Sequence, residues 1–307
     1  MENTGTWPRV VVVGAGAVGG YFGGLLAMAG APVVMVGRPA FVAAVDTAGL
    51  LLDTLQFKKR VSVKASSELV AARGADLVLF CVKTTDTLAT ARELAPLLAP
   101  QAIVVSLQNG VDNGEQIRNA GLEALPAVVY VAASVPEPGT VKHVGRGDLV
   151  LGPESETTVR AAEIFRRAGI PCRISENILG ELWVKLIWNC ALNAISALGH
   201  VQYRQIAMAP EACRLVETVV EEVLAVARAA QVVLPGVSDS KAAAAGALKI
   251  AEQMADARSS TAQDINRGKR TEIDSLNGYI ARRGAELGVP TPVNHALYAL
   301  VKLLESR

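Results

Sequence analysis

The sequence has few of the residues with which proteins bind nucleic acids or metal ions. Among its 307 residues, 30 Lys+Arg stand against 29 Asp+Glu, and a formal net charge of +1 provides no overall field to attract nucleic acid or an anionic membrane. Aromatic residues make up 4% of the chain, too few for platforms that stack single-stranded bases. The histidines, His143, His200 and His295, share no metal-ligand spacing with one another or with a cysteine, so we expect no metal. The composition favours a protein that acts on a small molecule.

Cysteine is also scarce, and its distribution bears on the compartment. The four cysteines form no Cys-x-x-Cys pair, and each lies among apolar neighbours, where a free thiol behaves as a small hydrophobic side chain. They are Cys81, Cys172, Cys190 and Cys213. Free thiols are typical of a reducing compartment, so we expect a cytoplasmic protein.

Charged residues are missing from Val10 to Gly37, a stretch long enough to cross a membrane. Seven glycines between Gly14 and Gly30, followed by Ala31-Pro32, divide this stretch into a strand, a glycine loop, a helix and a second strand. Arg9 is the only cation that precedes it, which does not fit a signal peptide. We therefore predict neither a membrane span nor a signal peptide.

Short continuous runs of Val, Ile and Leu predict a sheet that is covered on both faces. The runs are Val10–Val13, Val33–Val36, Leu77–Val82, Ile103–Leu107 and Ala127–Val131. Stretches of helical length lie between them, such as Thr87–Leu98 and Glu115–Ala120. Alternating strands and helices are typical of an α/β fold, here a Rossmann-type, doubly wound and mainly parallel sheet.

The pattern changes after this sheet. Thr140–Gly152 predicts two short antiparallel strands at the sheet edge, split by Gly145-Arg146-Gly147, and a short helix is expected over Thr157–Ala168. Beyond Ser175 the chain is helical, with periodic segments near 176–199, 211–231, 240–257, 271–288 and 293–305. We predict a Rossmann domain over residues 1–174 and an all-α substrate and catalytic domain over residues 175–307.

A glycine loop follows the first strand and precedes a helix. The loop Gly14-Ala15-Gly16-Ala17-Val18-Gly19 matches G-x-G-x-x-G in the context that this fingerprint requires. The first glycine permits a tight turn, the second lets the backbone approach a pyrophosphate, and the third lets helix and strand pack closely. FAD and NAD(P) use the same loop, and a glycine-rich turn at a packed corner is the structural alternative.

The end of the second strand favours one dinucleotide. Val36-Gly37-Arg38-Pro39 has no acidic residue for a ribose 2′-hydroxyl, and the next one is Asp46. The guanidinium of Arg38 can make charge-assisted hydrogen bonds to a 2′-phosphate, whereas a carboxylate would repel that phosphate. We therefore predict NADP(H) rather than NAD(H) or FAD. The alternative is that Arg38 is an ordinary solvated arginine at a strand end.

Two more polar residues follow predicted strands. Lys83 comes after Leu77–Val82, and Asn109 comes after Ile103–Leu107. Ligands of open α/β sheets bind outside the carboxyl ends of the strands, which makes both residues candidates for the site. Asn-Gly is also a common turn, and a lysine after a strand often serves solubility alone.

An apolar helix in the second half carries a single cation. Between Glu181 and Arg204, Lys185 is the only charged residue, so we expect a largely buried helix. Asn189 and Asn193 follow Lys185 at i+4 and i+8, on the same face. A buried ammonium gives up its proton readily, which suits a general acid in carbonyl reduction. The alternative is a lysine that extends to solvent, with asparagines that bond neighbouring helices.

A second polar concentration lies in the helical part. It comprises Ser259-Ser260-Thr261-Ala262-Gln263-Asp264 and Arg270-Thr271-Glu272-Ile273-Asp274. The hydroxyl groups can donate hydrogen bonds to a substrate carboxylate, and Glu272 can accept a hydrogen bond from a substrate hydroxyl. Alternatively, these residues only begin a helix. Thr271 and Asp274 then form a capping box, and the negative charge of Glu272 interacts favourably with the positive end of the helix dipole.

Taken in this order, these motifs resemble the ketopantoate reductase (2-dehydropantoate 2-reductase) family. The glycine loop, Arg38, Lys-x-x-x-Asn-x-x-x-Asn and Ser-Ser…Thr-Glu-Ile-Asp all have counterparts there, and the resemblance extends from Val10 to about residue 300. Similar residues also occur at Gln108-Asn109-Gly110, His143-Val144-Gly145-Arg146-Gly147 and Asn277-Gly278.

The resemblance implies NADPH-dependent reduction of 2-dehydropantoate to (R)-pantoate, on the way to pantothenate and coenzyme A. It implies that Lys185 is the proton donor, that Glu272 orients the substrate and that Lys83 lies near nicotinamide and substrate. It also implies a substrate site lined by Asn109, Asn189, Asn193 and either Ser259 or Ser260. We expect a 2-oxoacid as substrate and neither nucleic acid nor membrane as partner, and the C-terminal helices have faces suited to a homodimer. The alternatives are a reductase of another 2-oxoacid and a non-catalytic NADP-binding sensor.

Overall fold

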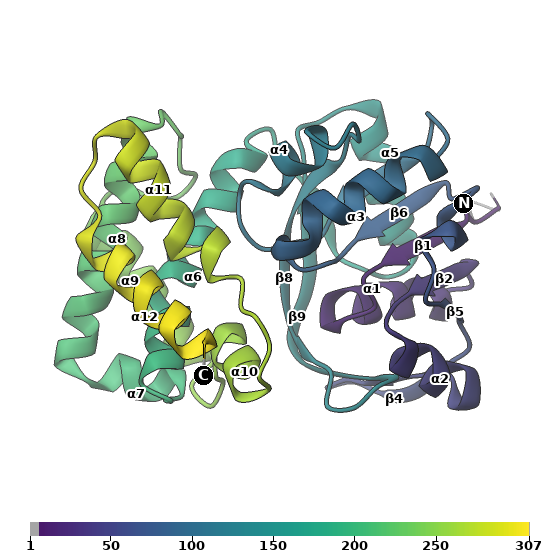
Figure 1. The fold of residues 1–307 in the computed structure, drawn as a ribbon, viewed down its shortest axis with the longest axis horizontal. Helices are drawn as coiled ribbons and strands as arrows, with labels where there is room; N and C mark the ends of the chain where they lie inside the picture. The colour runs from purple at the N-terminus through teal and green to yellow at the C-terminus, as the bar shows by residue number, and fades with distance from the viewer. Residues whose placement is uncertain (1–5, 307) are drawn as a thin grey trace. The chain divides into compact units, whose positions relative to one another are not determined.

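The computed structural model describes residues 6–306, which form two compact units (Figure 1). One unit contains the chain up to Gln108 together with Asp112–Ile178. The other contains Asn109–Val111 and the chain from Leu179 onward. The sequence does not indicate that Asn109–Val111 belongs to the second unit, or that residues 175–178 belong to the first.

The first unit is built on a sheet that has ten strands within residues 6–306, in the order β4-β3-β9-β8-β7-β6-β1-β2-β5, with β10 beside β9. The strands are β1 (Val10–Val13), β2 (Val33–Val36), β3 (Leu50–Asp53), β4 (Lys58–Val61), β5 (Lys64–Ser66), β6 (Leu77–Phe80), β7 (Ile103–Ser106), β8 (Leu125–Ser134), β9 (Thr140–Leu151) and β10 (Cys172–Ile174). From β8 to β5 all neighbours in this order are parallel, which confirms the predicted Rossmann-type sheet.

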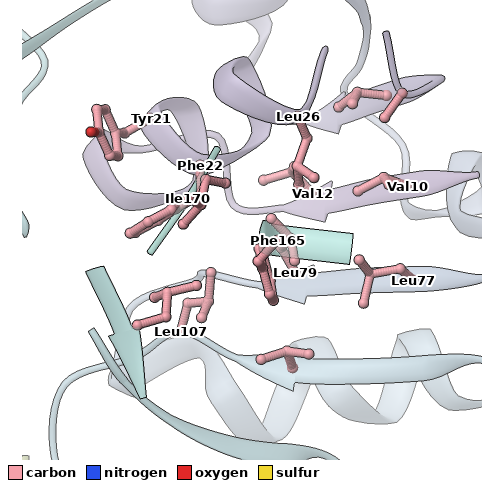
Figure 2. Close-up of a cluster of buried hydrophobic side chains, with 14 of the residues drawn as sticks. Val10, Val12, Tyr21, Phe22, Leu26, Leu77, Leu79, Leu107, Phe165 and Ile170 are labelled. Carbon is pink, nitrogen blue, oxygen red and sulfur yellow. The ribbon is translucent and has the colours of Figure 1, made fainter. Parts of the chain in front are cut away.

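Helices cover both faces of this sheet. They are α1 (Ala17–Met28), α2 (Pro39–Ala48), α3 (Thr87–Leu94), α4 (Asn113–Arg118) and α5 (Glu156–Arg167), with 3₁₀ turns η1 (Leu69–Ala72), η2 (Thr84–Asp86) and η3 (Ala95–Leu97). On one face Val12 packs in a cluster with Phe22 of α1 and Phe165 of α5 (Figure 2). On the other face Val13 belongs to a cluster with Leu94 of α3. Because both faces are buried, the strands need the continuous apolar runs from which they were predicted.

The segment predicted to form an antiparallel pair at the sheet edge differs from the prediction. Instead of two short edge strands, Thr140–Leu151 forms the single strand β9, which lies inside the sheet, antiparallel to β8 and parallel to β3. The prediction is wrong because Gly145-Arg146-Gly147 does not end the strand but forms irregularities within it. The register with β8 shifts twice, and Arg146 and Gly147 have φ of 55° and 145°. The short strands β3, β4 and β5 were not predicted. The sequence of β4 is cationic and that of β5 is polar, whereas β3 is an apolar run that the prediction missed.

The second unit is all-α, as predicted. Its elements are α6 (Ile178–Leu198), α7 (Tyr203–Met208), α8 (Pro210–Ala229), α9 (Ser240–Gln253), α10 (Ser260–Asn266), the 3₁₀ turn η4 (Ile273–Ser275), α11 (Asn277–Leu287) and α12 (Pro292–Glu305). The predicted helix over 271–288 is wrong at its start, because η4 occupies that position and α11 begins at Asn277.

Helix α6 is the central element of this second unit. Ile187, Cys190 and Ala194 are fully buried in a core shared with Val219 of α8 and Val301 of α12. By length and composition α6 could cross a membrane, and it is the only such helix in the described part of the chain. Its apolar window is 67% buried inside the protein, as expected for a core helix.

Candidate active site

The glycine loop between β1 and α1 has the tight turn that the fingerprint requires. Gly14 has φ of 100°, and a Cβ there would lie 2.7 Å from the carbonyl carbon of Cys81. The N–H groups of Gly14 and Ala15 both donate to the carbonyl of Val36, at 3.0 Å each. Glycine is therefore needed at residue 14 for its backbone conformation and for its close approach to β6.

Gly19 and Gly16 are needed for different reasons. A Cβ at Gly19 would lie 2.3 Å from the carbonyl oxygen of Gly14 and 2.8 Å from Cγ1 of Val12, so glycine permits α1 to pack on β1. A Cβ at Gly16 would meet nothing within 4 Å, and the residue is exposed. The protein itself therefore does not require glycine at residue 16, which fits a loop that leaves room for a ligand. The first N–H groups of α1 lack helical acceptors and suit an anion there.

Arg38 lies immediately after β2, where it is the N-cap of α2. Its side chain is exposed, and among residues 6–306 no carboxylate pairs with it. The N–H groups of Phe41 and Val42 donate to its carbonyl and fix its backbone, at 2.9 and 3.1 Å. The guanidinium is thus available to a phosphate at the end of the second strand, as a 2′-phosphate site requires.

Gln108 joins the segments that follow β6 and β7. Its Nε2 donates to the carbonyl of Val82 at 2.9 Å and to Oγ1 of Thr87 at 2.7 Å. Its Oε1 accepts from Oγ of Ser106 at 2.9 Å. The buried amide therefore fixes the loop that carries the half-buried Lys83. The sequence pointed to Gln108 only as part of a family motif, and a glutamine directly after an apolar run is the signal of this role.

Three predicted site residues meet in the helical unit. Nζ of Lys185 donates to Oδ1 of Asn109 at 2.8 Å, and Nδ2 of Asn109 donates to Oε2 of Glu272 at 3.1 Å. Lys185 lies on α6, Asn109 in the short segment that belongs to this unit, and Glu272 at the N-cap of η4. All three side chains are half-buried. The Asn109 amide thus links an ammonium to a carboxylate, an arrangement suited to binding a polar substrate.

The two asparagines that follow Lys185 on α6 differ in accessibility. Asn189 is half-buried, and its side chain makes no hydrogen bond within residues 6–306. Asn193 is buried, and its Oδ1 accepts from the hydroxyl of Tyr203 at 3.2 Å. Asn189 therefore has an amide to offer to a substrate, whereas the amide oxygen of Asn193 is engaged within the protein.

The two serines also differ. Ser259 is 1% exposed, and its Oγ accepts from the N–H of Ala262 and donates to the carbonyl of Asn193, both at 3.0 Å. Ser259 is thus the N-cap of α10 and links it to α6. Ser260 is exposed.

The capping box that was the structural alternative for Thr271 and Asp274 is not formed. Oγ1 of Thr271 accepts from the N–H of Ile273 at 3.2 Å and donates to Glu305 on α12. The carboxylate of Asp274 accepts from Tyr298 and Lys302, also on α12. The alternative is wrong because the Thr271 N–H donates to Glu305 and the Asp274 carboxylate accepts from α12, so the reciprocal bonds between side chain and backbone N–H are not made.

Comparison with known proteins points to the family that the sequence motifs resemble. Residues 10–156 match the family model "Ketopantoate reductase PanE/ApbA", and residues 177–305 match "Ketopantoate reductase PanE/ApbA C terminal". The 2-dehydropantoate 2-reductase of Pyrococcus horikoshii is 32% identical over 305 residues, which cover 97% of this chain and 98% of the relative.

Solved structures are similar over the same length. A PanE/ApbA family ketopantoate reductase from Ralstonia eutropha JMP134 matches with a TM-score of 0.91 and 48% identity, over 97% of this chain and 98% of that one. A D-mandelate dehydrogenase, in a ternary structure with NADH and anilino(oxo)acetate, shares the fold at a TM-score of 0.89 and 24% identity, over 97% and 98% of the two chains.

The fold and the matches define the class of this protein as an oxidoreductase with a dinucleotide-binding fold. Within that class, the chain belongs to the ketopantoate reductase family. This confirms the resemblance found in the sequence motifs.

Proposed function

We propose that this protein reduces 2-dehydropantoate to (R)-pantoate with NADPH. The observation that carries the proposal is the link from Lys185 through Asn109 to Glu272, which gathers a proton donor and a hydroxyl acceptor in one unit. The relative from Pyrococcus horikoshii, named for this reaction, is matched over nearly its whole length.

The residues of the glycine loop fit a dinucleotide. Gly16 leaves open space, the N-terminus of α1 provides unbonded N–H groups, and Arg38 offers a guanidinium for the 2′-phosphate of NADP(H). When bound, the reduced dinucleotide supplies a hydride to the carbonyl carbon. Lys83 follows β6, one of the strands whose carboxyl ends hold ligands in this fold.

Lys185 is the proton donor in this proposal. The carbonyl oxygen gains negative charge during reduction, and a nearby ammonium stabilises this charge and then transfers a proton from Nζ. The hydrogen bond to Asn109 holds Nζ in place. Substrate alignment depends on Glu272, whose carboxylate accepts a bond from the 4-hydroxyl of 2-dehydropantoate, and on the accessible amide of Asn189.

Arg38→Ala tests the choice of dinucleotide. A charge-assisted hydrogen bond contributes about 1.5–3 kcal/mol, so we expect NADPH affinity to fall about 10- to 100-fold. NADH affinity is the internal control and should be unchanged, because NADH lacks the 2′-phosphate. Equal losses for both dinucleotides would assign Arg38 to the shared part of the cofactor and remove the argument for NADPH.

The reaction itself is tested by NADPH oxidation with purified protein. We expect turnover with 2-dehydropantoate and weaker turnover with a panel of aliphatic and aromatic 2-oxoacids. Turnover with another 2-oxoacid alone would reject 2-dehydropantoate as substrate while keeping the reductase. NADPH binding without turnover across the panel would instead indicate the sensor.

A further inference from the structure

The residue before Glu272 is bonded tightly to the C-terminal helix. The N–H and the hydroxyl of Thr271 both donate to Oε1 of Glu305 on α12, at 2.6 Å each. Thr271 is 1% exposed, and the Glu305 side chain is 8% exposed. Two charge-assisted bonds in surroundings with little water hold this backbone position firmly.

The chain is bonded to the same helix two residues after Glu272. Oδ1 of Asp274 accepts from the hydroxyl of Tyr298 at 2.8 Å, and Oδ2 accepts from Nζ of Lys302 at 3.1 Å. Tyr298 and Lys302 are four residues apart, so both extend from one face of α12. Helix α12 packs against η4 and lies beside α11 (Figure 1).

Lys302 connects these two attachments into one network. Its Nζ lies 3.1 Å from Oδ2 of Asp274 and 2.7 Å from Oε2 of Glu305. The α12 clamp, as we name it, consists of Thr271, Asp274, Tyr298, Lys302 and Glu305. Glu272 lies between the two points at which the clamp holds the backbone.

We propose that the α12 clamp positions Glu272 for the substrate, with Asp274, Lys302 and Glu305 as positioning residues. A carboxylate that aligns a substrate acts only if its backbone is fixed, because a displacement of about 1 Å can cost on the order of 10² in rate. Glu272 is the N-cap of η4, a 3₁₀ turn of three residues that has few hydrogen bonds of its own to fix the backbone there. The proposal rests on the role given to Glu272 in the proposed function.

Glu305→Ala is the first test, because it removes the acceptor of both Thr271 bonds. We expect kcat/KM for 2-dehydropantoate to fall about 10- to 100-fold, mainly through KM, while NADPH affinity is unchanged. Glu305→Gln keeps an oxygen for Thr271 and should recover much of this loss. The matched control is Glu211→Ala, which removes an exposed ion pair with Arg214 on α8 and should leave KM unchanged.

A double-mutant cycle tests whether the clamp acts through Glu272. In a Glu272→Ala background the carboxylate is gone, so adding Glu305→Ala should have much less effect on kcat/KM than it has in the wild type. Effects that add fully would show that Glu305 does not act through Glu272 and would overturn the proposal. Lys302→Met provides the same comparison in case Glu305→Ala fails to fold.

Amide exchange separates failure of the clamp from failure of the proposed function. We expect both variants to speed hydrogen exchange over residues 271–275, because Glu305→Ala removes the acceptor of the Thr271 N–H and Lys302→Met removes the ammonium that bonds Asp274 and Glu305. If the wild type has no activity on 2-dehydropantoate, the proposed function fails, and the clamp is judged by exchange and by any 2-oxoacid that is turned over. Unchanged exchange and unchanged KM in folded variants would reject the clamp.

Discussion

At the scale of single residues, Asn109 determines how the charges of the candidate site are arranged. Its amide oxygen accepts from the Lys185 ammonium while its amide nitrogen donates to the Glu272 carboxylate. An aspartate there would repel Glu272, and an aliphatic residue would bond neither group. An amide is thus the side chain that can bond the ammonium and the carboxylate at the same time.

Lys185→Met is expected to remove the proton donor while keeping the length and apolar contacts of the side chain. A positioned proton donor contributes about 10²–10⁴ in rate, so kcat should fall by that factor with NADPH affinity unchanged. Steady-state kinetics and dinucleotide titration measure the two effects. Lys249→Met, at an exposed lysine of α9, is the control. Wild-type kcat in Lys185→Met would exclude Lys185 as the acid.

Gly19→Ala and Gly16→Ala should separate packing from ligand binding. The new methyl of Gly19→Ala would lie 2.3 Å from the Gly14 carbonyl oxygen, and such overpacking costs about 1–3 kcal/mol, measurable as a lower Tm. Gly16→Ala meets no protein atom within 4 Å, so it should keep the Tm and weaken NADPH binding. A Gly16→Ala protein with unchanged NADPH affinity would contradict the expected approach of the pyrophosphate.

At the scale of elements, the sequence predicts best where one residue pattern determines one environment. Continuous apolar runs identified β1, β2, β6, β7 and β8, because strands covered on both faces have no polar alternation. The cationic edge strand β4 has no such signal, since it acquires its structure from pairing with β3. Turn residues within β9 misled the prediction, because pairing with β8 accommodates them as irregularities.

The candidate site was predictable only where a local sequence pattern determines the position of its residues. Helical spacing placed Lys185 and Asn189 on one face of α6, and this local rule holds. The bond from Asn109 to Glu272 joins residues 163 apart in sequence, which no local pattern encodes. The absence of the alternative capping box at Thr271 and Asp274 has a similar cause, since both side chains have bonding partners on α12.

The clamp on α12 should make stability depend on pH. Burial raises the pKa of Asp274 and Glu305, but hydrogen bonds, from Tyr298 and Lys302 to Asp274 and from Lys302 and Thr271 to Glu305, outweigh it and hold both pKa values below their usual range. Groups with lowered pKa stabilise the fold above their usual pKa of about 4, and this contribution is lost as pH falls through the lowered values.

Asp274→Asn tests this dependence. Near neutral pH we expect a Tm about 2–4 °C below that of the wild type, corresponding to about 1 kcal/mol. The difference should shrink as pH falls below about 4, and it should be lost once pH passes through the lowered pKa, where the wild-type carboxyl in the folded protein is also protonated. Thermal melts across pH measure this, with Asp256→Asn, at an exposed ion pair with Arg204, as the control. A difference that is constant down to low pH would contradict the assignment.

At the scale of the whole molecule, the two units have separate hydrophobic cores, and each core holds thiols. Cys172 belongs to the core of the sheet unit and Cys190 to that of the helical unit. Burial raises the pKa of Cys81 and Cys190, and it raises that of Cys172 to about 11 even though Arg166 lowers it. Cys81 and Cys213 are both half-buried, and Cys213 lies on α8.

The rate of thiol labelling therefore measures how readily each core opens, through Cys172 in the sheet unit and Cys190 in the helical unit. Since the thiolate is the reactive form, we expect an aromatic disulfide reagent at about pH 8 to label Cys213 quickly and the other three cysteines slowly. All four should react in denaturant, because none forms a disulfide. The fast phase should vanish in Cys213→Ser. Rapid labelling of several thiols in the native protein would mean that the cores open more readily than their packing indicates.

The path of the chain limits how members of this family can recombine. The backbone enters the helical unit at Asn109, leaves it after Val111 and re-enters at Leu179. A chimera that joins a foreign helical half after Ile178 would therefore keep the host's Asn109 beside a donor's lysine and glutamate. Under the proposed function, transfer of the whole substrate site requires three crossover points, so a single crossover would combine site residues from two parents.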